Sequence, residues 1–78
     1  MTDLEKSLVQ CFSTVFPELS EKETLSATTD AVKNWDSLKM VNLLIVIQEE
    51  FNISFQPEEY ETLTSFDLIL SILQIKIT

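Results

Sequence analysis

Apolar residues recur at helical spacing in three stretches of this 78-residue chain, which favours an all-α fold. In the first stretch the intervals of three, four and one place them along one face of a helix: Leu4, Leu8, Cys11, Phe12, Val15 and Phe16. Thr2 or Asp3 can cap the start of this helix. Pro17 is expected to end it, because the residue before a proline is pushed out of the helical conformation.

The second helix is expected from about Ser37 to Phe51 and is apolar almost all the way round. Asn52 is expected to end it in the left-handed conformation, because the chain has no glycine for that position. Two apolar strips run along this helix, with Gln48 between them. The first comprises Leu43, Leu44, Ile47 and Phe51, and the second comprises Leu38, Val41 and Ile45. Periodicity alone leaves open whether the second strip is also buried.

Two further helices are expected in the last third of the chain. Pro57, followed by two glutamates, predicts a brief helix that ends near Thr62. Ser65 and Asp67 begin a last helix, whose apolar residues share one face: Phe66, Ile69, Leu70 and Leu73. The tail 74–78 alternates apolar and polar residues, and we expect a frayed helix end because no strand partner for it is evident.

Residues 17–35 show no periodicity and predict a long loop between the first two helices. Leu25 and Val32 are expected to pin this loop across the helices. Trp35 can either anchor the loop on the helices or stack on a bound group, and the anchoring role is favoured. Three main helices, one short helix and this loop predict a four-helix bundle that forms a single domain over residues 1–78.

The composition argues against a self-sufficient enzyme. The chain has no histidine, which excludes Ser-His-Asp and Cys-His nucleophile systems, and no glycine, which excludes phosphate-binding glycine loops. Its single cysteine, Cys11, can form neither an internal disulfide nor a Cys-x-x-Cys metal pair, and we expect it to be a small core residue. No metal site is predicted.

The formal net charge of −8 restricts the partners of the chain. Nucleic acids and anionic membrane surfaces would repel such a protein, whereas partners with basic patches would attract it. Neither a signal segment nor an apolar run long enough to span a bilayer is visible. We therefore expect a soluble, cytoplasmic protein, monomeric and not inserted in a membrane.

The run from Asn34 to Leu38, where the polar loop meets the second helix, is the candidate functional site. The free N–H groups and the dipole of a helix start favour an anion, so a phosphate ester on Ser37 would be well placed. Asp36 could help to hold the metal ion of a phosphate-transferring enzyme, and Leu38 offers an apolar contact. Asp36 and Ser37 can also be simple helix caps. Neither is followed three residues later by Glu or Gln, so a reciprocal capping box is absent.

The tripeptide Asp36-Ser37-Leu38 resembles the Asp-Ser-Leu motif of acyl carrier proteins. The resemblance extends over essentially the whole chain. It is a resemblance to the discrete acyl carrier proteins, which are separate single-domain chains. The segment Gln48-Glu49-Glu50-Phe51-Asn52-Ile53 is similar to the ending of the family's second helix. Phe55, Pro57-Glu58-Glu59 and Leu63-Thr64-Ser65-Phe66 fall where the family places its third helix and the start of its fourth.

The resemblance implies that Ser37 receives 4'-phosphopantetheine from coenzyme A, with Asp36 and Leu38 beside it. Acyl groups then travel as thioesters on this flexible arm, and partner enzymes supply the catalysis. The implied partners are a phosphopantetheinyl transferase and acyl-loading and acyl-accepting enzymes with basic or apolar docking patches. In the family the first strip faces the core. The expected partner-binding residues are Leu38, Val41, Ile45, Gln48 and Glu49.

The second helix departs from the acidic surface typical of fatty-acid carriers, because it carries Lys39 and Asn42 near its start. This departure favours a specialised pathway, such as a specialised lipid, a polyketide or a surface-saccharide acyl transfer. An aminoacyl or peptidyl carrier is an alternative, although such carriers are usually glycine-rich before the serine and Asn34-Trp35-Asp36 is not. Two further alternatives are a carrier-like regulator that stays unmodified and a small acidic helical adaptor.

Overall fold

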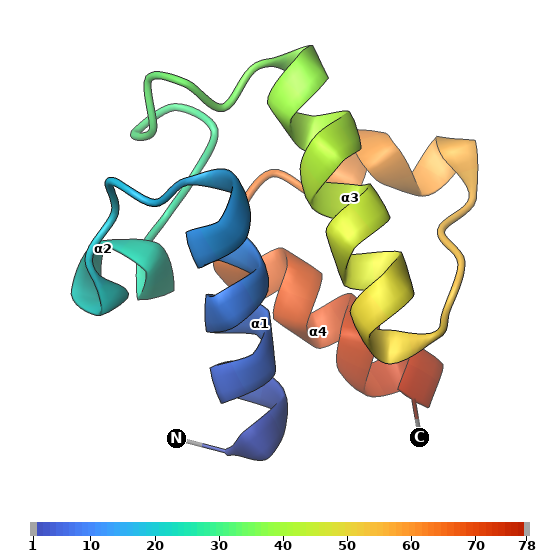
Figure 1. Ribbon diagram of the computed structural model, residues 1–78. Helices are drawn as coiled ribbons and strands as arrows, with labels where there is room; N and C mark the ends of the chain where they lie inside the picture. Colours follow the sequence, from blue (N-terminus) through green and yellow to red (C-terminus); the bar gives the residue numbers. More distant parts are fainter. Residues whose placement is uncertain (1, 78) are drawn as a thin grey trace.

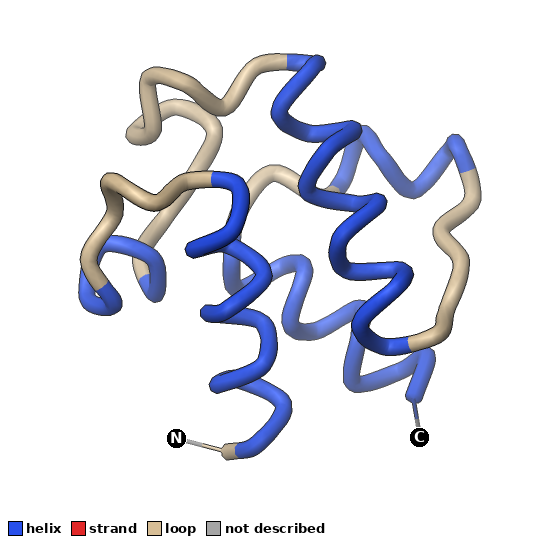
Figure 2. The backbone as a smooth tube through the Cα atoms, viewed as in Figure 1, coloured by secondary structure: helices blue, strands red, loops and turns tan. Residues whose placement is uncertain are grey.

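Five helical segments make up most of residues 2–77, the part of the chain that the computed structural model describes (Figure 1). They are α1 (Asp3–Val15), α2 (Glu21–Leu25), α3 (Ser37–Phe51), the 3-10 helix η1 (Pro57–Thr62) and α4 (Phe66–Ile77). Over these residues the backbone shows helices and loops without a strand (Figure 2). The predicted all-α class is confirmed. None of the helices in this range is long and apolar enough to cross a membrane.

Helix α1 is capped by Thr2, the first of the two capping residues that the sequence suggested. The Thr2 hydroxyl accepts a hydrogen bond from the Glu5 N–H at 3.2 Å, and the Glu5 carboxylate accepts one from the Thr2 N–H at 3.2 Å. The Thr2 hydroxyl also donates to this carboxylate at 3.1 Å, and the bonds from the Thr2 N–H and hydroxyl hold the pKa of the Glu5 carboxyl below its ordinary value. The helix ends at Val15, as expected from Pro17, and Phe16 donates its N–H back to the Phe12 carbonyl.

Helix α2 corrects the prediction that residues 17–35 form a loop throughout. Ser20 and Glu23 form a capping box, with the Glu23 N–H 3.1 Å from the Ser20 hydroxyl and the Ser20 N–H 2.9 Å from the Glu23 carboxylate. The helix is only five residues long and the single residue that it buries is Thr24, so it has no apolar periodicity to reveal it. The spacing of Ser20 and Glu23 was the signal that could have predicted it.

The 17–35 segment is fixed to the helices by buried side chains and by backbone hydrogen bonds. Val32 is buried as predicted, whereas Leu25 is only partly buried against the core. Backbone bonds then join the segment to the start of α4, because the Thr29 N–H donates to the Thr64 carbonyl at 2.9 Å. The Phe66 N–H returns a bond to the Ala27 carbonyl at 3.0 Å. These two bonds fix residues 27–29 to the start of α4, and the chain continues from there to α3.

Four aromatic rings from three parts of the chain form the centre of the core. The Phe12 ring lies 5.3 Å from the Phe66 ring and 5.5 Å from the Trp35 ring, which it meets edge to face. The Phe16 ring lies 5.8 Å from Trp35. Such contacts are favourable beyond the area that they bury. Trp35 thus anchors the loop on α1, as predicted, and Cys11 is buried beside these rings on α1.

Helix α3 packs against α1, and the two helices run in opposite directions (Figure 1). The first apolar strip faces the core as expected: Leu43, Leu44 and Ile47 are buried and Phe51 is partly buried. Asn52 ends the helix in the left-handed conformation with a φ of 55°, as predicted. The second strip is exposed, so it is not part of the core.

The last two helical segments are linked by an ion pair. Segment η1 occupies the predicted range but is a 3-10 helix. Lys76 Nζ on α4 lies 3.1 Å from the Glu59 carboxylate. Hydrogen bonds from the Gln56 N–H and from Lys76 lower the pKa of Glu59. The tail that we expected to fray continues as helix to Ile77, and Thr78 lies outside the described residues.

Candidate functional site

Ser37 is the first residue of α3, immediately after the residue that caps this helix. The Asp36 carboxylate accepts the Lys39 N–H at 2.9 Å, and the Asp36 carbonyl accepts the Met40 N–H at 2.9 Å. The structure therefore confirms the capping role of Asp36. It also confirms the absence of a capping box, because Lys39 stands three residues later. Ser37 is exposed, and within residues 2–77 its hydroxyl has no hydrogen-bond partner.

The start of α3 suits an anion attached to this hydroxyl. The helix is fifteen residues long, and its first turn contains no acidic residue after the Asp36 cap. Its dipole and the N–H groups that Asp36 leaves free would stabilise the charge of a phosphate ester on Ser37. The arrangement can therefore hold a phosphate without a basic side chain at the site.

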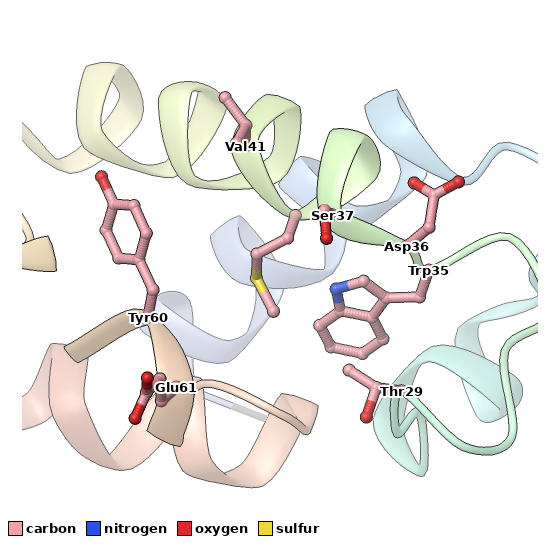
Figure 3. Close-up of a pocket in the computed structure, with 8 residues that line it drawn as sticks. Thr29, Trp35, Asp36, Ser37, Val41, Tyr60 and Glu61 are labelled. Carbon is pink, nitrogen blue, oxygen red and sulfur yellow. The ribbon is translucent and has the colours of Figure 1, made fainter. Parts of the chain in front are cut away.

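A pocket of about 430 Å³ opens beside Ser37 (Figure 3). Three residues that the sequence analysis had assigned to the loop–helix junction line it: Trp35, Asp36 and Ser37. Val41 of the second strip also lines it. Four further lining residues were not predicted from the sequence: Thr29, Met40, Tyr60 and Glu61. Met40 lies one helical turn after Ser37, so the spacing could have indicated it. Thr29, Tyr60 and Glu61 come from the distant loop and η1, and only the folded chain brings them to Ser37.

Trp35 forms part of this pocket with a hydrogen-bond donor that is not used. The residue is 5% exposed, and its indole Nε1 finds no acceptor among the described residues. Leaving a buried donor unpaired costs about 1–3 kcal/mol. Figure 3 shows the indole nitrogen on the side of the ring that faces the pocket, with the Ser37 hydroxyl directed into the same space.

The second strip of α3 forms an exposed apolar surface that begins at the pocket. Leu38, Val41 and Ile45 are 69%, 46% and 47% exposed, and we call these three residues the docking strip. Glu49 is exposed farther along the helix. Gln48 is half-buried, and its side-chain oxygen accepts the Phe55 N–H at 2.8 Å. Gln48 therefore stabilises the chain after α3, and its expected contact with partners stays a prediction.

Lys39 directs its charge away from the docking strip. Its Nζ donates to the Val15 carbonyl at the end of α1 at 3.4 Å and lies 5.9 Å from the centre of the Phe16 ring. The last turn of α1 has no basic residue of its own, so Lys39 supplies the positive charge that the end of a helix favours. This lysine is thus a structural contact between α3 and α1.

Possible metal ligands do not gather at this site or elsewhere in residues 2–77. No group of three or more cysteine or acidic side chains in that range could hold a metal ion. Asp36 is the only carboxylate next to Ser37 in the sequence, and Glu61 is the other carboxylate that lines the pocket.

Comparison with known proteins finds a relative that covers nearly the whole chain. The acyl carrier protein of Buchnera aphidicola subsp. Baizongia pistaciae is 32% identical to this chain over 74 residues, which are 95% of each protein. The chain matches no family model, and it matches no solved structure.

Proposed function

This chain belongs to the acyl carrier protein family, and on that basis we propose that Ser37 carries 4'-phosphopantetheine and shuttles acyl or related groups between partner enzymes. Acyl carrier proteins are carriers without catalytic activity, and their family implies this cofactor. The observation that carries the assignment to Ser37 is its exposed, unpaired hydroxyl at the first position of α3, beside a pocket. The bound group supplies a terminal thiol on which the cargo is held as a thioester.

The residues around Ser37 fit such a group. The helix start stabilises the phosphate, as described above. Met40, Val41 and Tyr60 offer apolar surface in the adjoining pocket, and Trp35 offers a free N–H donor. The exposure of Ser37 and Leu38 gives a transferase access to the hydroxyl from solvent. Attachment forms a bond from Ser37 Oγ to phosphorus, releases the nucleotide half of coenzyme A and passes the hydroxyl proton to the transferase.

Asp36 has two roles under this proposal, and two substitutions separate them. Asp36→Ala is expected to lower the free energy of unfolding by about 1 kcal/mol, because the Lys39 N–H loses its cap. Asp36→Asn keeps a capping oxygen and is expected to keep the stability. If Asp36 also contacts the metal ion of the transferase, the Asn variant should load about tenfold more slowly. Thermal unfolding and the initial loading rate measure the two effects, and loading at the wild-type rate would limit Asp36 to capping.

The test of the proposed function is the intact mass of the protein after incubation with coenzyme A, magnesium and a broad-specificity phosphopantetheinyl transferase. We expect a gain of one phosphopantetheine group, on the peptide that contains Ser37. The mass of protein purified from its native source then shows whether the group is present in cells. No gain with the transferase would contradict the proposal and favour an unmodified acidic adaptor.

We propose the docking strip as the surface that partner enzymes contact, including the transferase. Its exposure next to Ser37 and its apolar character support this role. The charge of Glu49 and the net charge of −8 favour partners with basic patches near an apolar groove. The specialised pathway stays a prediction, and this apolar surface supports it. The cytoplasmic location, the monomeric state and the exclusion of nucleic acid also stay predictions.

Val41→Asp and Ile45→Asp are expected to lower kcat/KM for loading by the transferase at least about tenfold, because each buries a carboxylate in an apolar contact. The free energy of unfolding should change by no more than about 0.5 kcal/mol, since both side chains are exposed. Asn42→Asp is the matched control, because it adds the same charge at an exposed position of α3 outside the strip. An equal loss in the control would assign the effect to charge, and unfolding of the strip variants would place the strip in the core.

A further inference from the structure

The indole N–H of Trp35 is a buried donor that lacks an acceptor within residues 2–77. The indole Nε1–H can only donate, so it forms a hydrogen bond only where an acceptor lies next to it. Nearly all buried polar groups in native proteins are paired, and an exception calls for an explanation. An acceptor that is present only when the protein carries its ligand would explain this one.

The surroundings of Nε1 indicate what that acceptor is. The indole ring packs against both the Phe12 and the Phe16 ring, at centroid distances of 5.5 and 5.8 Å, so the donor has a fixed direction. It faces the pocket into which the Ser37 hydroxyl also points (Figure 3). Trp35 therefore lines the space that a group attached to Ser37 enters first, and its buried donor is on the side of the ring that faces this space.

The pocket favours a neutral acceptor over an anionic one. Its apolar surface comes in part from Met40 and Val41, whereas Glu61 is an acidic lining residue and the Asp36 carboxylate caps α3 next to the pocket. These carboxylates would repel a carboxylate or a second phosphate, but they do not repel the oxygen of a neutral carbonyl group. A carbonyl with apolar neighbours matches both the free donor and the walls.

We propose that Trp35 Nε1 donates a hydrogen bond to a neutral carbonyl oxygen of the group attached to Ser37. The inference rests on the proposed function, because the acceptor arrives only with that attachment. Two sources supply the same chemistry: an amide of the phosphopantetheine arm, or a carbonyl of its cargo. Because the group is tethered at the pocket, its effective concentration there is high, and a single hydrogen bond is enough to hold it in the pocket.

If the acceptor is a carbonyl of the cargo other than that of the thioester, Trp35 is a specificity-determining residue. A site built around a donor disfavours an analogue without the acceptor, since that donor then stays buried and unpaired. The pocket would then hold a cargo with a carbonyl near its thioester in preference to a saturated chain of equal length.

Nitrogen-15 NMR tests the proposal directly, because Trp35 is the only tryptophan and gives a single indole signal. Four forms are compared: unmodified protein, and protein loaded from coenzyme A, butyryl-coenzyme A or acetoacetyl-coenzyme A. The last two cargoes have equal length and differ in one carbonyl group. Hydrogen bonding is expected to shift the indole proton downfield and to slow its exchange with solvent about fivefold. Ser37→Ala with the same reagents is the control, and its signal should stay where the unmodified protein has it.

The pattern of shifts identifies the acceptor. A shift that is already complete in the protein loaded from coenzyme A assigns the bond to the arm. A shift that both cargoes produce, and coenzyme A does not, assigns it to the thioester carbonyl. A shift confined to the acetoacetyl form assigns it to the added carbonyl. A mass gain without a shift in any form overturns the inference and leaves the proposed function standing. No mass gain overturns both, and a shift in the Ser37→Ala control overturns the inference because free reagent then causes it.

Trp35→Phe provides a second measurement that does not depend on the indole signal. This variant keeps an aromatic ring in the core and removes the donor. With carbon-13 carbonyls in the arm and in the acetoacetyl cargo, the bonded carbonyl should move downfield in the wild-type protein and lose that shift in the variant. An unchanged carbonyl shift in a variant with wild-type circular dichroism would contradict the proposal. If the variant does not fold, the comparison of the four wild-type forms decides.

Discussion

Ser37→Ala is expected to abolish attachment of phosphopantetheine completely and to leave the fold intact. Alanine removes the only atom on which the phosphate ester can form at this position. It also fits the first turn of a helix well, and the Asp36 cap does not involve the Ser37 side chain. The stability should therefore change by no more than about 0.5 kcal/mol. Intact mass measures attachment, and circular dichroism with thermal unfolding measures the fold.

Ser13→Ala is the matched control for this experiment. Ser13 is an exposed serine on another helix, α1, and its replacement makes the same chemical change. We expect the control to gain one phosphopantetheine group at the wild-type rate. A mass gain that persists in Ser37→Ala would show that another hydroxyl accepts the group and would overturn the assignment to Ser37.

Phe12→Ala is expected to unfold most of the protein at 25 °C. The Phe12 side chain is fully buried and contacts three other aromatic rings, those of Phe16, Trp35 and Phe66. Removing a buried phenylalanine ring costs about 3–5 kcal/mol. A single core in a domain of this size rarely supplies more than about 3–5 kcal/mol in total. Loss of the helical circular dichroism signal, or a greatly lowered denaturation midpoint, is the expected result.

Leu38→Ala shows by contrast how the chain divides apolar residues between core and surface. Leu38 is 69% exposed, so its truncation should change the free energy of unfolding by no more than about 0.5 kcal/mol. The two variants delete large apolar side chains with opposite expected outcomes. A stable Phe12→Ala protein would show that the core repacks around the missing ring, and the central role of the aromatic cluster would then be wrong.

Local signals in the sequence predicted most of the fold. The apolar spacing that begins at Leu4 indicated α1, and the caps at Thr2 and Asp36 lie where the residue types indicated them. Asn52 takes the left-handed conformation that a helix end without glycine requires. Each of these features depends on residues within a few positions of one another, which is the range over which a sequence pattern is informative.

Features that depend on distant residues were not predictable in the same way. Tyr60 and Thr29 reach the pocket beside Ser37 only because η1 and the loop are folded around α3. Lys39 bonds to the Val15 carbonyl, 24 positions earlier, so its sequence position did not reveal that its charge is used within the fold. The motif at Ser37 could therefore be located from the sequence, but its pocket and the free donor of Trp35 could not.

The burial of Cys11 in the core has a consequence for the thioester chemistry proposed for this protein. Burial, with a smaller effect from the Glu50 carboxylate, raises the pKa of the Cys11 thiol to about 11. At neutral pH only about one molecule in ten thousand would carry the thiolate, which is the form that attacks thioesters and disulfides. The chain has no other cysteine. Under the proposed function, a carrier with a thioester cargo would thus be protected from transferring that cargo to its own cysteine.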